Sequence, residues 1–326
     1  MANLLDKANI LITPTAYSDG KIHSAKPIEA TADLNFTRGS GATRTNAQGS
    51  RENSQGNNTP RINYKDGVGS WLIEPQSTNL YLNSALIVTQ NITTLASSYT
   101  VSFYGTGTIT FTGTYSGSLT GTGVNDRVSI TFTTTSGTLT SAVSGTVTQG
   151  QAEEGNITSY IPTIGSVQTR LAETASRSGL GDLIDSTQGV LYVEMSAFSN
   201  DGTYRILSLS DGTSANRVYI QYTITTNQLL SIIKVGGSTQ GTLYTNLSNV
   251  TDFIKLAIKW SENDFAMWVN GVEVSNDNNG STPIANTLNT FQFADGTGGN
   301  NFYGNIKELA VFPILTDEEL TCLTTI

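Results

Sequence analysis

The stretch Gln151-Ala-Glu-Glu-Gly-Asn-Ile-Thr-Ser-Tyr-Ile-Pro-Thr163, with the seven residues that follow it up to Arg170, divides this sequence into two parts. A run rich in Thr, Ser and Gly precedes it, and a second β-rich block with longer apolar segments follows it. Gly155, Pro162 and Gly165 punctuate the stretch, and both residue types interrupt regular structure. We predict that the stretch is the last strand of one β-sandwich followed by a linker.

Upstream of this stretch, apolar residues alternate with Thr and Ser over short segments. The pattern is clearest in Tyr99–Tyr104, around Ile109 and Phe111, and in Val128–Phe132. A period of two places the apolar side chains on one face of a strand and the polar ones on the other. Short strands separated by Gly-containing turns are typical of a sandwich. We therefore assign residues 81–163 to a small β-sandwich.

Downstream, the strongest local signal is Asn270-Gly271 between two apolar runs, because this dipeptide tolerates the positive φ angles of a type I′ hairpin turn. About ten strands in the block would fit a jelly roll, which we assign to residues 190–326. Trp260 and Trp268 are expected in its core. The other predicted strands of the block are Val190–Met195, Arg205–Leu209, Val218–Ile224, Leu229–Val235, Phe253–Trp260, Phe265–Val269, Phe291–Phe293 and Ile306–Phe312.

The two ends of the chain differ from these blocks. Residues 1–80 show little periodicity, and we expect an irregular region with brief strands at Arg61–Tyr64 and Ser70–Ile73. Arg38–Asn58 is rich in Gly, Ser, Asn and Arg, so we expect this stretch to be disordered or held by a partner. Residues 164–189 are expected to be a linker. Thr316 and Glu319 have the spacing of a capping box and predict a short C-terminal helix. The predicted fold class is all-β, with two sandwich or jelly-roll modules.

The composition of the 326 residues narrows the class of protein. The net charge is −9 and no basic cluster is present, which is a poor match for nucleic acid. Cys322 is the only cysteine, so no disulfide can form within the chain. No apolar run approaches the roughly 20 residues of a membrane helix, and Ile10–Ile12 is too short for a signal peptide. We expect no nucleic acid or membrane partner, and a protein that stays in the cytosol unless a larger particle carries it out.

The sequence offers no complete catalytic set. His23 is the only histidine, and we expect an ordinary surface residue. Metal sites with several His or Cys ligands are therefore excluded, and no phosphate-binding Gly loop is present, so we expect no metal and no cofactor. Glycosidases need two carboxylates that face one cleft, whereas Glu194 and Glu273 stand alone in their strands and Glu153–Glu154 point to opposite faces. We predict that the protein is not an enzyme.

Sugar binding is the next candidate chemistry. The polar loop Asp295–Tyr303 ends in two aromatic residues, and we predict that Asn300, Asn301 and Tyr303 contact a glycan, with the Tyr303 ring as a platform. The alternative for Tyr303 is a strand residue that enters the core. Asp201-Gly202 and Asp211-Gly212 are either turns or Ca²⁺ ligands, since hard cations need clustered oxygen atoms.

Several segments, in this order, resemble phage and prophage virion proteins, including relatives from the crAss-like phages of gut Bacteroidetes. The N-terminal segments are Phe36–Arg44 with Asn46–Gly49, Pro60–Tyr64 and Leu72–Leu80, and the middle ones are Glu153–Gly155, Ser159–Thr163 and Thr169-Arg170. In those proteins the middle segments close a small carbohydrate-binding-like sandwich. There are two departures: Ser77 stands where relatives usually carry a basic residue, and Ser50–Thr59 is polar where they have an apolar run.

The second block resembles concanavalin-like and laminin-G-like lectin folds, through Val269–Gly271, Gly304–Leu309 and Leu315–Leu320. Together the resemblances imply a structural virion protein, a fibre or spike subunit on tail or capsid, assembled in the host cytoplasm. Residues 1–80 would attach to other virion proteins, and the β modules would reach a host-surface glycan. Such fibres are commonly homo-oligomers, often trimers. The alternatives are a polysaccharide-degrading tailspike with glycosidase activity and a bacterial surface adhesin.

Overall fold

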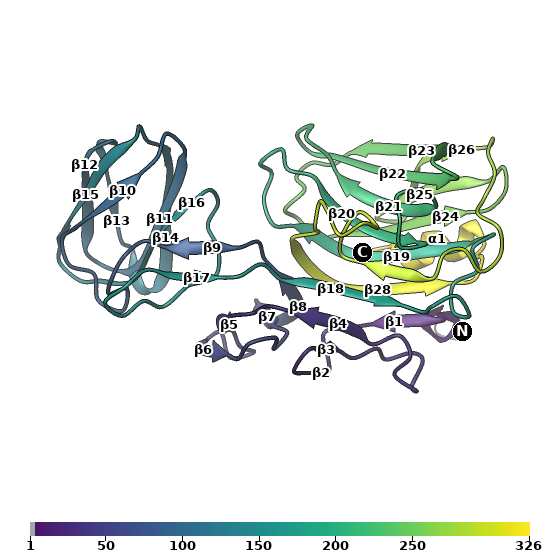
Figure 1. The fold of residues 1–326 in the computed structure, drawn as a ribbon, viewed down its shortest axis with the longest axis horizontal. Coiled ribbons are helices and arrows are strands. Elements are labelled where there is room, and N and C mark those ends of the chain that lie inside the picture. Colours follow the sequence, from purple (N-terminus) through teal and green to yellow (C-terminus); the bar gives the residue numbers. More distant parts are fainter. Residues whose placement is uncertain (1–3) are drawn as a thin grey trace.

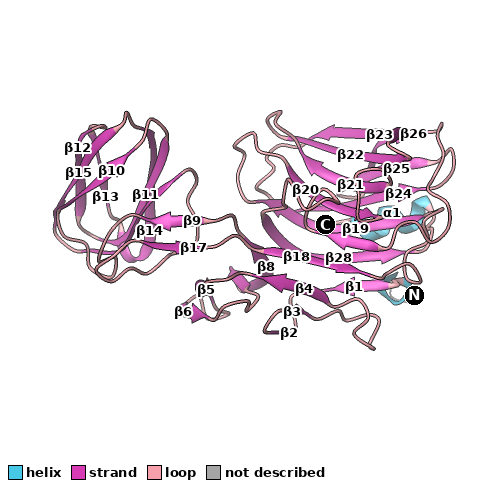
Figure 2. Ribbon diagram, viewed as in Figure 1, coloured by secondary structure: helices cyan, strands magenta, loops and turns pink. Residues whose placement is uncertain are grey.

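The computed structural model describes residues 4–326, except for the side chains of Asn53 and Ser54. It consists of 50% strand and 4% helix, so the predicted all-β class is confirmed. Figures 1 and 2 show two β-sandwiches of unequal size joined by a narrow connection. No helix in the described range is long and apolar enough to cross a membrane.

The first sheet of the large sandwich has eight strands and is antiparallel throughout. Its central strand β19 is buried on both faces, because a second apolar cluster covers the outer face beneath the C-terminal helix α1 (Asp317–Thr324) and the 3-10 turn Leu4–Lys7. The strands run in the order β26 (Val272–Asp277), β25 (Phe265–Val269), β24 (Ile254–Trp260), β19 (Gly189–Ala197), β28 (Gly304–Phe312), β8 (Val68–Ile73) and β7 (Ile62–Lys65), with β1 (Ile10–Ile12) also paired to β28.

The second sheet of the large sandwich has nine strands and encloses the main apolar core with the first. Alternation of apolar and polar residues gives these strands one buried face, as in Leu34-Asn35-Phe36-Thr37, where Leu34 and Phe36 are buried and their neighbours exposed. The strands run in the order β2 (Tyr17–Ser18), β3 (Lys21–Ile22), β4 (Leu34–Thr37), β18 (Thr174–Ser178), β27 (Thr290–Gln292), β20 (Arg205–Ser210), β21 (Arg217–Tyr222), β22 (Gln228–Val235) and β23 (Ser238–Asn246).

The small sandwich packs a four-stranded sheet on a three-stranded one around a separate core that includes Phe103, Phe111 and Phe132. Many of its outward positions carry Thr, and Thr100 and Thr131 bond to each other across two strands. The first sheet has the order β10 (Gln90–Thr94), β15 (Gly137–Ser144), β12 (Thr108–Gly113) and β13 (Gly117–Thr120), and the second has β14 (Gly123–Thr133), β11 (Ser98–Gly105) and β16 (Val147–Glu154).

The small sandwich is inserted into the large one. The chain leaves the large sandwich after β8 through β9 (Ser77–Asn79) and returns to β18 through β17 (Gln168–Arg170). These two short strands pair antiparallel to each other and form the neck seen in Figure 1. A separate hairpin, β5 (Ala42–Thr45) and β6 (Arg51–Gln55), lies beside the neck.

Two sequence predictions are wrong at the level of secondary structure. Residues 4–80, expected to be irregular apart from two brief strands, form β1 to β9, because β1, β4 and β8 pair with β28 and β18, far along the chain. The two strands predicted at Arg61–Tyr64 and Ser70–Ile73 agree with β7 and β8. Residues 164–189, expected to be a linker, contain β17, β18 and the buried Leu180 and Ile184. The remaining part of the first region, residues 1–3, lies outside the described residues.

The local signals in the second block agree with the structure. Asn270 and Gly271 have φ values of 50° and 85°, as the type I′ turn between β25 and β26 requires. The hydroxyl of Thr316 accepts from the Glu319 amide, and the Glu319 carboxylate accepts from the Thr316 amide, which completes the capping box of α1. Trp260 and Trp268 are buried as expected.

Candidate binding cleft between the two sandwiches

Five charged side chains form a buried ionic group at the neck, which we call the neck cluster: Arg38, Arg61, Glu74, Arg170 and Glu173. All five are nearly or fully sealed from solvent. Distances are 2.6 Å from Arg38 Nη1 to Glu173 Oε1, 2.6 Å from Arg61 Nη2 to Glu173 Oε2, 2.7 Å from Arg61 Nη2 to Glu74 Oε2 and 3.0 Å from Arg170 Nη1 to Glu74 Oε2.

The cluster ties the two sandwiches together. Ser159, just after the small sandwich, donates its amide and hydroxyl to Glu74, at 2.7 and 2.6 Å. Glu153, at the end of β16, is fully buried and accepts from Ser77 in β9 and from Thr158. A buried charge is stable only when such partners are complete, so separating the two modules at the neck would leave Glu74 and Glu153 without several of these partners.

The electrostatics of the neck cluster favour an ionised carboxylate on Glu74. Burial alone would raise the pKa of Glu74, but the charges of Arg170 and Arg61 and the hydrogen bonds from Ser159 outweigh it and lower the pKa to about 2. Burial would likewise lower the pKa of Arg61, and the charges of Glu173 and Glu74 reverse this effect and raise it. Glu74 and Arg61 therefore remain charged throughout the neutral range.

We expect acid to weaken the neck. The pKa of Glu74 is about 2 in the folded chain against 4.5 for a free glutamate, so its stabilisation is complete above pH 4.5 and is lost as the pH falls toward 2. Urea unfolding midpoints between pH 7 and pH 2 measure this, and Glu74→Gln should show a flatter pH dependence than the parent. Glu154→Gln, at an exposed glutamate at the end of β16, is the control. A Glu74→Gln curve parallel to the parent curve would contradict the assignment.

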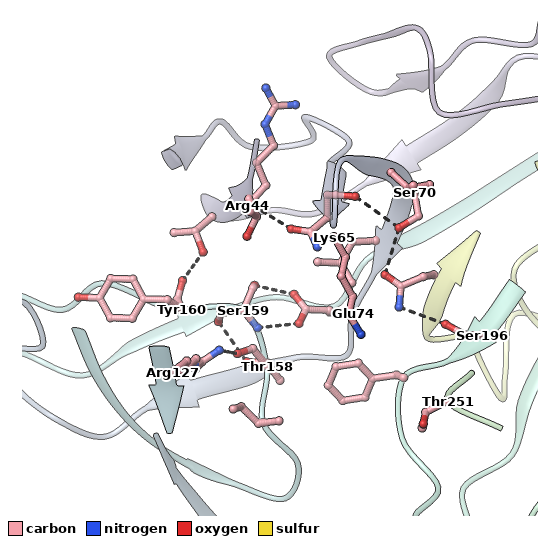
Figure 3. A pocket seen from close by; sticks show the side chains of 18 of the residues that line it. Arg44, Lys65, Ser70, Glu74, Arg127, Thr158, Ser159, Tyr160, Ser196 and Thr251 are labelled. Carbon is pink, nitrogen blue, oxygen red and sulfur yellow. Dashed lines mark hydrogen bonds between the residues drawn. The ribbon is translucent and has the colours of Figure 1, made fainter. Parts of the chain in front are cut away.

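A polar cleft of about 630 Å³ lies in front of the neck cluster, between the two sandwiches and the β5–β6 hairpin (Figure 3). The large sandwich contributes Ser196, Phe198, Thr251, Phe253, Asn305 and Lys307, and the small one contributes Tyr104 and Arg127. Segments next to the neck contribute Thr158, Ser159 and Tyr160, the hairpin contributes Arg44 and Arg51, and Glu74 forms part of the floor. We call this the inter-sandwich cleft.

The cleft is cationic although the chain is acidic. Five basic side chains line it, namely Arg44, Arg51, Lys65, Arg127 and Lys307, against the three acidic residues Asp66, Glu74 and Asp252. Arg44 is paired with Glu52 at 2.7 Å and points away from Glu74 in Figure 3. Lys307 is paired with Glu194 at 2.9 Å and lies 3.9 Å from the centre of the Phe253 ring.

Arg51 and Arg127 are the two guanidinium groups of the cleft wall that have no carboxylate partner within the described residues. The Arg51 guanidinium lies 4.9 Å from the ring centres of both Tyr104 and Tyr160, and its Nη1 is buried without an acceptor. Arg127 donates to the Thr158 carbonyl and the Ser102 hydroxyl, at 2.7 and 2.8 Å, and its Nε is buried without an acceptor.

The residues proposed from the sequence lie next to this cleft rather than in its wall. Asn300 is exposed, and its side-chain amide bonds to Asp295 at 3.0 Å. Asn301 donates to the Tyr303 hydroxyl at 3.4 Å, and Tyr303 is half-buried against the main core. Their polar groups are thus bonded within the loop. Glycan contact through Asn300, Asn301 and Tyr303 stays a prediction.

Other sites considered from the sequence have structural roles. His23 Nδ1 lies 2.6 Å from Asp33 Oδ2, while the nearby Ser24 hydroxyl bonds to Asp33 rather than to His23, so no nucleophile–base pair forms there. Asp211 accepts from the Thr213 amide two residues on, and Asp201 pairs with Arg205, which makes both Asp-Gly pairs parts of hydrogen-bonded turns. No group of three or more His, Cys, Asp or Glu able to hold a metal exists among the described residues.

One carboxylate pair was missed because its members are far apart in sequence. Glu194 in β19 and Glu308 in β28 are directly opposite each other in the sheet. Burial and then the charge of Glu194 raise the pKa of Glu308. The single-strand pattern could not reveal a pair formed across two strands.

The arginines of the cleft and the neck were also missed as a site, although a signal was present. Four arginines, Arg38, Arg44, Arg51 and Arg61, fall within 24 residues of a chain that has only 17 Lys and Arg in total. This region was expected to be irregular, so the concentration of charge was not read as part of a folded site.

Comparison with known proteins identifies no family. No protein-family model and no curated protein matches the chain. Among solved structures, the carbohydrate-binding module CBM40 of the Ruminococcus gnavus IT-sialidase bound to α2,3-sialyllactose has 19% identity over 43% of this chain and 84% of that chain, with a TM-score of 0.37. A lichenase, a prokaryotic β-1,3-1,4-glucanase from a mouse hindgut metagenome, has 16% identity over 44% and 73%, with a TM-score of 0.34.

The leech intramolecular trans-sialidase has 20% identity over 44% of this chain and 24% of that chain, with a TM-score of 0.37. Similarity at this level does not identify a ligand or a reaction.

Proposed function

We propose that this chain is a non-catalytic, glycan-binding appendage protein of a phage virion, and that the glycan binds in the inter-sandwich cleft. The observation that carries the binding role is the cleft itself. Its volume of about 630 Å³ lies in the range of ligand sites, and its polar and aromatic lining is held by a rigid neck. An exposed hydroxyl such as that of Thr251 suits sugar hydroxyls, and aromatic rings suit the apolar face of a sugar.

The virion part of the proposal rests on the sequence resemblance. Since residues 4–80 are folded into the large sandwich and the neck, attachment to other virion proteins would use a folded surface rather than an extended arm. We also propose that the protein forms a homo-oligomer, such as a trimer. Locating the protein in an intact particle by antibody labelling tests this part, and its absence from purified particles would overturn it.

Filling the cleft tests the binding role. Thr251 is an exposed residue that lines the cleft, and Thr225 is an exposed turn residue outside it. With a glycan identified on an array of bacterial surface polysaccharides, we expect Thr251→Trp to weaken binding at least about tenfold, the size of one good contact of about 1.4 kcal/mol, and Thr225→Trp to leave it unchanged. If Thr251→Trp and Thr225→Trp bound the glycan equally well, the ligand would bind outside the cleft. Loss of binding in Asn300→Ala would place the ligand on the Asp295–Tyr303 loop.

A glycosidase is the second candidate, favoured by the cross-strand pair Glu194 and Glu308. Residues opposite each other in an antiparallel sheet have their side chains on the same face, with Cβ atoms about 4.5–5.5 Å apart, and glycosidases need two carboxylates that face one cleft. Against it, Glu194 is already paired with Lys307. Release of reducing ends from the bound polysaccharide, abolished in both Glu194→Gln and Glu308→Gln, would establish this activity. No release over hours with binding intact would support the non-catalytic role.

A further inference from the structure

We propose that Arg51 and Arg127 form an anion-binding subsite in the inter-sandwich cleft, and that the ligand carries an acidic sugar whose carboxylate binds there. This inference deepens the proposed function and rests on it. Two cations of the cleft wall carry it, Arg51 on the β5–β6 hairpin and Arg127 on β14 of the small sandwich. Neither cation has a carboxylate partner among residues 4–326.

The surroundings leave both cations poorly compensated. Burial lowers the pKa of Arg51, and the Tyr104 and Tyr160 hydroxyls oppose this. Tyr104, whose ring centre lies 4.9 Å from the Arg51 guanidinium, is the cross-strand neighbour of Arg127, so the two arginines lie close together. Burial also lowers the pKa of Arg127, and the charge of Arg51 acts in the same direction. Glu153 and Glu74 act in the opposite direction on Arg127, but their carboxylates are bound to Ser, Thr and Arg partners. An anion between the two arginines would compensate both charges.

The donor groups fit a carboxylate on a sugar. A guanidinium has five N–H donors, and only two of those on Arg127 have acceptors in the protein, at Thr158 and Ser102. Arginine binds planar carboxylates through paired hydrogen bonds, which a compact ammonium cannot do. The rings of Tyr104 and Tyr160 hold Arg51 from two sides, so its position is set before a ligand arrives. Hydroxyl and amide groups of the adjoining wall would then bind the rest of the sugar.

The test compares matched probes on the full chain. The acidic probe is an oligosaccharide that contains glucuronic acid, the neutral probe is its carboxyl-reduced glucose counterpart, and a sulfated form of the neutral probe distinguishes a carboxylate from another anion. Glucuronate and inorganic sulfate alone test the subsite without a glycan. The variants are Arg51→Gln and Arg127→Gln. Arg177→Gln, another arginine without a carboxylate partner but outside the cleft, is the control.

We expect calorimetry to show that the acidic probe binds at least about tenfold more tightly than the neutral one, since hydrogen bonds to charged groups are each worth roughly a factor of ten or more. Either cleft variant should remove this preference with an unchanged melting temperature, Arg177→Gln should keep it, and added salt should weaken only the acidic probe. If the sulfated probe bound more tightly than the acidic probe, the carboxylate assignment would be overturned and the subsite would be one for sulfate.

The remaining outcomes separate the two proposals. Equal affinity for acidic and neutral probes, with Thr251→Trp abolishing both, would overturn the anion subsite and leave glycan binding in the cleft. Binding of glucuronate or sulfate that depends on Arg51 and Arg127, without any oligosaccharide binding, would keep the subsite and overturn the proposed function. Anion binding that persists in both arginine variants, or binding of none of the probes, would overturn the subsite.

Discussion

Replacing Glu173 with Gln is expected to lower the free energy of unfolding by about 3–5 kcal/mol, the usual result of removing one partner from a buried ionic group. Glu173 accepts from Arg38 Nη1, from Arg61 Nε and Nη2, and from the Glu74 amide, at 2.6 to 2.9 Å. Without its charge, three buried arginines would share Glu74 as their only carboxylate within the cluster. Urea unfolding at neutral pH, followed by tryptophan fluorescence, measures the loss.

The control for this prediction is Glu154→Gln, because Glu154 is exposed and belongs to no ion pair of the neck. We expect it to change stability by less than about 0.5 kcal/mol. If Glu173→Gln does not fold, the paired variant Arg38→Met with Glu173→Met tests the same site, since replacing a buried ion pair by apolar side chains is often tolerated. A loss as small as that of the control would show that the cluster contributes nothing to stability.

The second large effect is expected at Trp71, in the brief strand predicted at Ser70–Ile73 within a region otherwise expected to be irregular. Trp71 in β8 is 1% exposed, belongs to the main core and packs edge-on against Tyr17, with ring centres 6.1 Å apart. We expect Trp71→Ala to cost about 3–5 kcal/mol, as for other buried aromatic residues. Thermal and urea unfolding of the full chain measure it.

Val68 supplies the matched control, because it lies on the same strand but is 51% exposed, so Val68→Ala should have little effect. Trp71→Phe keeps an aromatic ring and removes an indole N–H that has no acceptor, so we expect a smaller loss than for Trp71→Ala. If Trp71→Ala unfolded at the same urea concentration as Val68→Ala, residues 4–80 could not be part of the folded core.

The sequence predicted those parts of the fold that depend on neighbouring residues. Alternation in Tyr99–Tyr104, the Asn270-Gly271 turn and the Thr316–Glu319 capping box are set within a few residues, and all three agree with the structure. β1, β4 and β8 are short, and their pairing depends on strands more than 100 residues away. A local pattern cannot report such a distant partner, so most of this region looked irregular, although the two strands of the local β7–β8 pair were predicted.

The same reason limited prediction of the site. Glu74 and Glu173 are 99 positions apart and meet only because the small sandwich is inserted between them. The cleft combines residues from the hairpin, the small sandwich and the N-terminal part of β28, so none of these segments carries the binding pattern alone. Asn300, Asn301 and Tyr303 were chosen because they form one polar and aromatic loop, which a single sequence can show.

The neck has an evolutionary consequence. The entry and exit strands of the small sandwich, β9 and β17, lie side by side, so the two ends of this module are neighbours. Recombination within a gene could therefore exchange the whole module for another whose ends are equally close, without disturbing the large sandwich. The exchanged segment would have to keep a donor equivalent to Ser159, because Glu74 would otherwise lose two hydrogen bonds inside the neck. Variants of this protein could thus acquire new cleft walls, and with them new ligands, while the large sandwich stays the same.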